Sequence, residues 1–128
     1  MKALLDTHSL LWFLEGNSEH LSINARGLIE KQEVRKFVSI VSLWEVVIKS
    51  NLGKLKLNRS LPEFKALIDF NGFSFLPILF EHTVPLLNLE LHHRDPFDRM
   101  LISQAIAEEM VVITKDKNFS FYNIKTIW

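Results

Sequence analysis

Short apolar segments alternate along this chain with longer segments in which apolar residues recur at helical spacing. The first pattern is typical of buried β-strands and the second of amphipathic α-helices. We expect strands at residues 2–5, 37–41, 73–78, 111–114 and 124–128, the last of them at an edge. We expect helices at residues 7–14, 22–31, 43 to about 53, 61–70, 81–89 and 97–110, although Pro85 weakens the case for the fifth.

Strands that alternate with helices indicate a parallel α/β sheet with helices on both faces. Right-handed crossover connections leave few topologies for such a sheet. The chain has no internal repeat and no Pro- or Ser-rich linker, and 128 residues are too few for two domains. We therefore expect residues 1–128 to form one domain.

Composition indicates the cellular location more than the fold. The absence of cysteine excludes disulfides, zinc–thiolate sites and thiol chemistry, and it suits a reducing compartment. No apolar run approaches the roughly 18 residues that span a bilayer, and the start of the chain is too short and too soon acidic for a secretory signal. We expect a cytoplasmic protein with no membrane contact.

Charge is balanced overall but uneven along the chain. The 15 basic and 15 acidic residues cancel, which argues against a protein that coats nucleic acid. Residues 46–62 nevertheless contain no acid, while Lys49, Lys54, Lys56 and Arg59 supply four cations. This run is either a solvated surface or a phosphate-binding edge, and the second interpretation requires an acidic site beside it.

Three carboxylates follow expected strands. Asp6 comes directly after the first strand, Glu45 lies in the turn after the second, and Asp116 follows the fourth. Asp98 stands at the start of the longest helix. Because the carboxyl ends of parallel strands meet at one edge of the sheet, we expect these side chains to lie together.

Each of these acids also has a simpler explanation as a helix cap. Asp6 and Asp116 precede helical segments, Ser42 and Glu45 have capping-box spacing, and Asp95 with Asp98 opens the helix at Pro96. Serine, threonine or asparagine caps equally well, however, so four carboxylates at these positions are a notable coincidence. A cluster of acids is destabilising unless protons or cations neutralise it. Oxygen ligands without cysteine suit Mg²⁺ or Mn²⁺, which can activate water against a phosphodiester.

The same residues lie in segments that resemble the motifs of PIN-domain ribonucleases. These segments are residues 4–8 (LLDTH), 39–45 (SIVSLWE) with Ile48-Lys49, 93–99 (HRDPFDR) and 114–116 (TKD). The match runs in order from residue 4 to about residue 122 and is most similar to VapC-like toxins of toxin–antitoxin pairs. The resemblance implies a three-layer α/β/α sandwich with a five-stranded parallel sheet. It also implies an endoribonuclease dependent on Mg²⁺ or Mn²⁺ and inhibited by a small VapB-like antitoxin.

Carried over by position, the resemblance makes Asp6, Glu45, Asp98 and Asp116 the four acids of the site. We expect Asp6 and Asp98 to be the principal metal ligands, and Glu45 and Asp116 to complete the coordination or orient water. Asp95 is expected to be a cap. Thr114 and Asn118 match polar supporters of the acids.

Other residues near the motifs have two interpretations each. Lys49, one helical turn after Glu45, can meet that acid or a phosphate. Arg94 and Arg99 are either phosphate clamps or solvated side chains. His92 and His93 are expected to have a structural role in a loop. The aromatic residues Trp12, Phe13 and Trp44 are expected in the core or at an interface, either of a homodimer or with the antitoxin.

Three other kinds of protein would fit parts of the pattern. A receiver-type signalling domain needs two adjacent acids after its first strand, and a phosphatase of the Asp-x-Asp kind needs a second acid after Asp6; Thr7 and His8 supply neither. A PIN-like domain that binds RNA or protein without cleavage, with the acids as caps, remains open. Loss of metal-dependent RNA cleavage in Asp6→Asn and Asp98→Asn would separate it from the enzyme.

Overall fold

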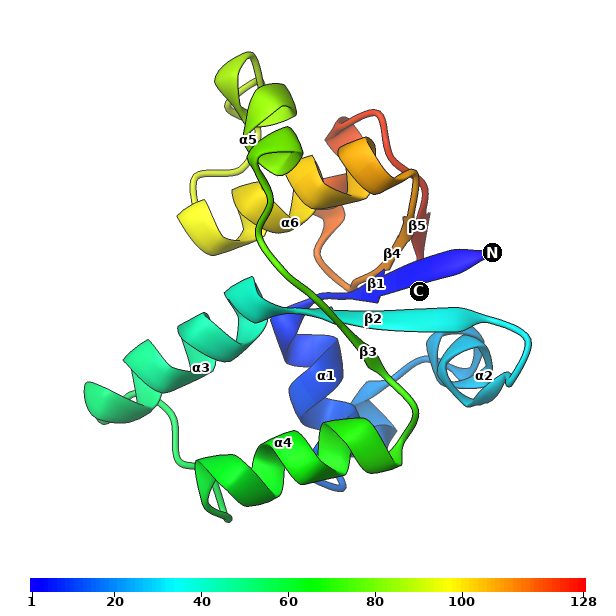
Figure 1. Ribbon diagram of the computed structural model, residues 1–128. Coiled ribbons are helices and arrows are strands. Elements are labelled where there is room, and N and C mark those ends of the chain that lie inside the picture. Colours follow the sequence, from blue (N-terminus) through cyan, green and yellow to red (C-terminus); the bar gives the residue numbers. More distant parts are fainter.

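In a computed structural model that describes residues 1–128, a five-stranded sheet passes through the centre of the protein (Figure 1). Its order is β3-β2-β1-β4-β5, and every neighbouring pair is parallel. The strands are β1 (Lys2–Leu5), β2 (Arg35–Ser39), β3 (Ser74–Leu76), β4 (Val111–Ile113) and β5 (Thr126–Ile127). The expected parallel sheet of five strands is confirmed, with the first strand at its centre and the last at an edge.

Six α-helices and two 3₁₀ helices connect the strands. The α-helices are α1 (Thr7–Leu14), α2 (Ile23–Glu30), α3 (Ile40–Asn51), α4 (Leu61–Phe70), α5 (Phe80–Leu87) and α6 (Pro96–Glu108). The 3₁₀ helices are η1 (Ser18–His20) and η2 (Lys117–Phe121). None of the helices is long and apolar enough to cross a membrane.

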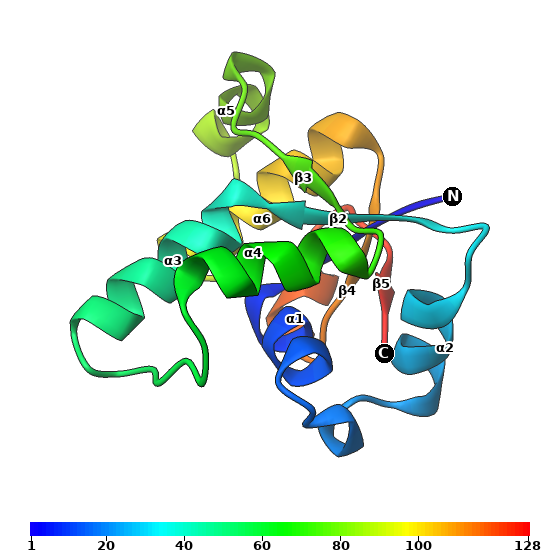
Figure 2. The same cartoon turned by 60° about the horizontal axis from the view of Figure 1, so that its bottom comes forward.

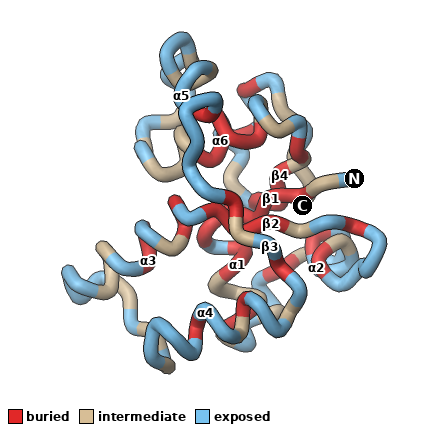
Figure 3. Tube along the Cα trace, viewed as in Figure 1, coloured by how far each residue is buried: buried red, intermediate tan, exposed pale blue.

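The two faces of the sheet carry separate apolar cores, which makes the fold the expected three-layer α/β/α sandwich. Ala3 and Leu5 of β1 face the side covered by α1, α2 and α4, whereas Leu4 between them faces α6. This alternation follows from the two-residue period of a strand. Figure 2 shows α1, α2 and α4 together on one side, and Figure 3 shows buried residues concentrated along the central strands.

The start of α3 differs from the sequence prediction. The second strand ends at Ser39 rather than residue 41, and α3 begins at Ile40 rather than residue 43. The Ser39 hydroxyl accepts the amide of Val41 and caps the helix. Ser42 therefore lies inside the first turn, and the capping box predicted for Ser42 and Glu45 is wrong.

The boundaries of three other elements also shift by a few residues. Strand β3 ends at Leu76, directly before Pro77, which has no amide to donate to a neighbouring strand. Helix α6 ends at Glu108, and Glu109 takes a left-handed conformation with φ of 54°. The predicted helix at residues 81–89 is present one to two residues earlier and accommodates Pro85.

Candidate metal centre

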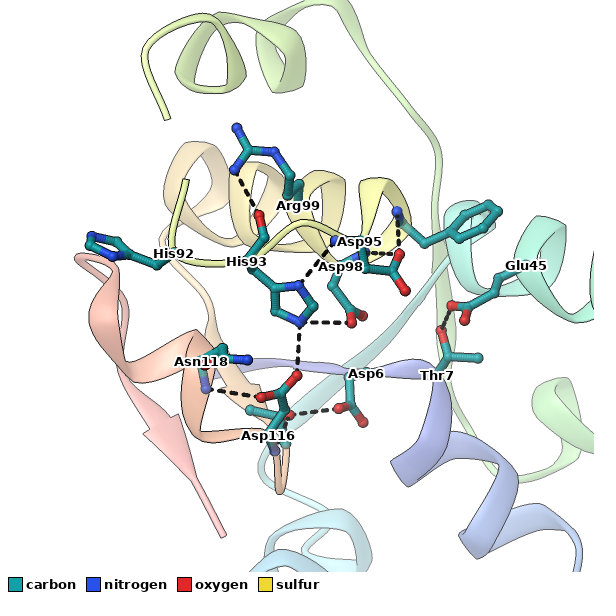
Figure 4. A network of polar contacts seen from close by, with 12 residues as sticks. Asp6, Thr7, Glu45, His92, His93, Asp95, Asp98, Arg99, Asp116 and Asn118 are labelled. Atoms are coloured by element: carbon teal, nitrogen blue, oxygen red, sulfur yellow. Dashed lines mark hydrogen bonds and ion pairs between the residues drawn. The ribbon is translucent and has the colours of Figure 1, made fainter. Parts of the chain in front are cut away.

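Four carboxylates from four elements approach one another at the carboxyl edge of the sheet. Asp6 follows β1, Asp116 follows β4, Asp98 lies in the first turn of α6 and Glu45 lies in α3. Figure 4 shows Asp6, Asp98 and Asp116 directed toward one region, with Glu45 approaching from α3. Burial raises the pKa of Asp98 to about 8, and the charges of Asp95, Asp6, Glu45 and Asp116 add to the effect. Asp98 and Asp116 thus lie in one tight group, and Asp6 and Glu45 are near enough for their charges to raise the pKa of Asp98.

Asp6 is a helix cap and a member of this group at the same time. Its Oδ1 atom accepts the amide of Ser9 at 2.9 Å, which caps α1. Its Oδ2 atom accepts the hydroxyl of Thr114 at 2.6 Å. The side chain is buried, and this burial raises the pKa of Asp6 although both hydrogen bonds act to lower it.

Thr114 links Asp6 to Asp116. While its hydroxyl donates to Asp6, the same oxygen accepts the amide of Asp116 at 3.0 Å. Asp116 in turn caps η2, because its Oδ1 atom accepts the amide of Asn118 at 2.9 Å. The expected contact of Thr114 with the acids is therefore present, whereas Asn118 meets Asp116 through its backbone.

Glu45 is held by one hydroxyl and one ammonium group. The Thr7 hydroxyl donates to Oε1 at 2.7 Å and lies 2.9 Å from the hydroxyl of Ser42. The Lys49 ammonium lies 2.6 Å from Oε2, so Lys49 meets Glu45, as one of its two interpretations held. This contact is the main cause that raises the pKa of Lys49. The Glu45 side chain is only 4% exposed, so the ion pair compensates a nearly buried charge.

A histidine joins the acids, which the sequence analysis did not foresee. His93 Nε2 lies 2.8 Å from Asp116 Oδ2 and 3.1 Å from Asp98 Oδ2. These three side chains form a group whose ligand-type atoms all lie within 4.8 Å of one another. The position of His93 two residues before Asp95, in the HRDPFDR segment, was the available signal, but nothing in the sequence shows that the ring turns toward the acids.

The capping explanation is correct for three acids and does not compete with the cluster. Asp95 caps α6 by accepting the amides of Phe97 and Asp98. Asp6 and Asp116 each cap with one oxygen and turn the other toward Thr114 or His93. A carboxylate has two oxygens, so one side chain can cap the start of a helix with one oxygen and face a shared site with the other.

A comparison with family models matches residues 3–125 to the PIN domain. The chain belongs to the PIN domain family. No curated protein matches the sequence of this PIN domain.

Solved structures with the same fold come from VapBC complexes. A DNA-bound VapBC from Salmonella typhimurium is similar with a TM-score of 0.70 and 18% identity, over 99% of this chain and 97% of that chain. VapBC2 from Rickettsia felis, bound to a DNA fragment from its promoter, has a TM-score of 0.67 and 17% identity over 99% and 98% of the two chains. VapBC-1 from nontypeable Haemophilus influenzae has a TM-score of 0.67 and 15% identity over 99% and 97%. At identities this low, the similarity shows that the PIN domain shares its fold with these chains and nothing further.

The two arginines near the acids differ in their surroundings. The Arg99 guanidinium donates to the carbonyl oxygens of Leu89, Glu90 and His93 at 3.0–3.1 Å. Arg99 thus binds the loop before α6, which favours a structural role over a fully solvated side chain and leaves a phosphate contact a prediction. Arg94 is exposed and stays available for a phosphate.

The three aromatic residues that the sequence singled out differ in how far they are covered. Trp12 and Phe13 pack against the core on the α1 side, and Phe13 meets Phe73 edge to face at 5.8 Å. Trp44 is 54% exposed and touches Phe97 edge to face at 5.1 Å. The apolar residues of α1 are therefore largely covered within the chain, and Trp44 is the exposed aromatic residue beside Glu45.

Proposed function

We propose that this PIN domain is an endoribonuclease that uses Mg²⁺ or Mn²⁺, held by Asp6, Glu45, Asp98 and Asp116, to hydrolyse RNA phosphodiester bonds. The observation that carries the proposal is the burial of several acids in one place, which raises the pKa of Asp98 to about 8. Like charges removed from water destabilise a fold unless protons or cations neutralise them. An arrangement that costs stability in this way is typical of a functional site.

The donor atoms fit a hard divalent cation. Four carboxylates supply oxygen ligands, and the chain contains no cysteine that would favour a softer metal. Asp6 and Asp98 would be the principal ligands, since burial raises the pKa of both and a cation would relieve the cost of ionising them. When bound, such an ion supplies an activated water and positive charge for in-line attack on a phosphodiester.

The remaining side chains have roles that follow from their exposure. Asp116 is 35% exposed, the more accessible of the two acids beside His93, and would complete the coordination and orient an attacking water. Glu45 would complete the coordination from α3, and Lys49 holds it in position through their ion pair. Arg94 would contact a phosphate of the bound strand.

A basic edge lies next to the acids, which supports a polyanionic substrate. A cavity of about 130 Å³ is lined by Thr7, His8, Glu45, Lys49 and Lys54, among others. It therefore joins an acid of the site to the segment 46–62, which contains no acid. The exposed Lys54 and Lys56 would bind the RNA backbone there, and this part of the affinity would fall with rising salt concentration.

Cleavage of a labelled RNA by the purified chain tests the proposal. The parent should cleave with Mg²⁺ or Mn²⁺ and lose activity with a chelator. Asp6→Asn and Asp98→Asn should each slow cleavage by roughly 10²–10³-fold, since they weaken a metal that supplies several kcal/mol of transition-state stabilisation. Asp69→Asn is the matched control, because Asp69 is an exposed acid on α4 paired with Lys65.

Two outcomes would contradict the proposal in different ways. Cleavage by Asp6→Asn and Asp98→Asn at the rate of the parent would show that the acids are not the catalytic centre. RNA binding without cleavage by the parent would instead support the non-catalytic PIN-like domain. If the parent does cleave RNA, sequencing the RNA ends produced after induction would identify which RNA is cut.

We further propose that the chain is the toxin of a toxin–antitoxin pair and that a small VapB-like protein inhibits it. The support is that the similar structures are VapB–VapC complexes. Induction alone should arrest growth, Asp98→Asn should abolish the arrest, and co-expression with a short DNA-binding protein from the neighbouring reading frame should relieve it. A homodimer stays part of the proposal, and light scattering of the purified chain at micromolar concentration tests it.

A further inference from the structure

The His93 imidazole lies between two acids of the proposed metal centre. It belongs to the loop that joins α5 to α6, and its side chain is only 10% exposed. Its Nε2 atom is within hydrogen-bond distance of both Asp98 and Asp116 (Figure 4). His93 is the side chain that contacts both carboxyl groups, so it is the ring that holds them at this separation.

The surroundings of the loop keep this ring in place. The Tyr122 hydroxyl accepts the amide of His93 at 2.7 Å and donates to the carbonyl of Glu90 at 2.7 Å. Arg99 donates to the carbonyl of His93 at 3.0 Å. The ring of Phe119 meets the imidazole edge to face at 5.6 Å. These contacts hold both the backbone and the ring of His93 in place.

The second ring nitrogen determines which atom carries the proton. The Asp95 amide donates to His93 Nδ1 at 3.2 Å, so Nδ1 has to offer its lone pair. A neutral imidazole has one N–H group, and it must then be at Nε2. Nε2 therefore donates to the carboxylates. To bind a cation itself, Nε2 would have to lose this proton to Nδ1, and the contact with Asp95 would be lost.

We propose that His93 is a positioning residue of the metal centre, whose Nε2–H holds Asp98 and Asp116 together and remains a donor to them when the cation is bound. The inference rests on the proposed function, because it assumes that both acids ligate the ion. A carboxylate oxygen has two lone pairs, so it can accept from His93 and still coordinate. Hydrogen-bond partners that orient metal ligands typically contribute 10–100-fold to metal affinity.

Nitrogen-15 NMR of the full chain tests the protonation state directly. Long-range proton–nitrogen correlations should show a protonated Nε2 and a lone-pair Nδ1 for His93, both without metal and with Mg²⁺ bound. Pulsed electron paramagnetic resonance with Mn²⁺ should show no directly coordinated nitrogen. Loss of the Nε2 proton on metal binding, or a strong nitrogen coupling to Mn²⁺, would make His93 a ligand and overturn the proposal.

Calorimetric titration with Mn²⁺ tests the contribution to affinity. His93→Ala should weaken binding by roughly 10–100-fold, and His93→Gln, whose amide can donate from a similar position, should restore part of the loss. His92→Gln is the control, because His92 is exposed and pairs with Glu90 instead of the acids. If His93→Ala binds Mn²⁺ as tightly as the parent, only this proposal fails. If the parent binds no Mn²⁺, the metal centre itself and the proposed function fail with it.

Discussion

Replacing Asp98 with asparagine removes the carboxyl group whose pKa is raised to about 8, first by burial and then by neighbouring acids. With this pKa, Asp98 is protonated in about nine of ten molecules at pH 7, about half at pH 8 and about one in ten at pH 9. A coordinating carboxylate has to be ionised, so a cation that binds there expels this proton. The parent should release about 0.9 proton per cation from Asp98 at pH 7 and about 0.1 at pH 9.

The same shift predicts how the stability of the metal-free protein varies with pH. Between the ordinary pKa of 3.8 and the folded-state value of about 8, the native state holds more protons than the unfolded state. The free energy of unfolding therefore falls as pH rises through this window. A difference of about 4 in pKa corresponds to on the order of 5 kcal/mol, and Asp98→Asn should remove most of this dependence.

Two measurements check this prediction. Calorimetric titration with Mn²⁺ in buffers of different ionisation enthalpy counts the protons released at pH 7, 8 and 9. Urea unfolding of the metal-free parent and of Asp98→Asn from pH 5 to pH 9 gives the stability curves. Asp69→Asn controls for the loss of one negative charge outside the site, and it should follow the parent in both experiments.

Two results would refute the reasoning. One is tight Mn²⁺ binding by the parent at pH 7 with no proton release, because the acids would then already be ionised. The other is a metal-free parent whose stability stays constant between pH 5 and pH 8. The pKa of Asp6 is raised as well, so a release above one proton at pH 6 would agree with the argument.

Two further substitutions test single contacts by urea unfolding of the metal-free protein. Lys49→Met should lower the free energy of unfolding by about 1–3 kcal/mol, because it leaves the nearly buried Glu45 carboxylate without its cation. Lys65→Met breaks the exposed pair with Asp69 at the same spacing and should lower it by about 0.5 kcal/mol or less. Equal losses would mean that the burial of Glu45 has no energetic effect. Thr114→Val should cost about 1–3 kcal/mol, since it removes the donor to the buried carboxylate that caps α1, and an unchanged midpoint would show that this hydrogen bond contributes nothing.

The elements of this PIN domain were largely predictable because their signals are local. Asp6, Ser22 and Asp95 cap the helices that the apolar pattern predicted, and Gly16, Gly53 and Gly72 adopt left-handed conformations close to the predicted helix ends. The alternation of strands and helices was enough to predict parallel pairing. The start of α3 was missed because Ser39 and Ser42 are both good caps in sequence, and only the position of the sheet edge selects Ser39.

The side chains around the acids were less predictable, since their contacts join residues far apart in the chain. Arg99 is an arginine next to Asp98, as a phosphate clamp would be, yet its guanidinium binds the backbone of the loop before α6. His93 differs from His92 in sequence only by its place in the HRDPFDR segment, and the loop conformation turns its ring toward Asp98 and Asp116 and the ring of His92 toward Glu90. Such choices depend on the loop conformation, which no periodicity in the sequence encodes.

The sequence by itself determined the kind of residue at each strand end, and with it the chemistry that the protein can offer. Carboxylates after β1 and β4, and at the start of α6, can cap a helix, bind a cation or do both, and the parallel alternation directs them to one edge of the sheet. The tertiary structure decided how charged that edge is. Burial and the mutual approach of the acids raise the pKa of Asp98, and both depend on packing across the whole sheet.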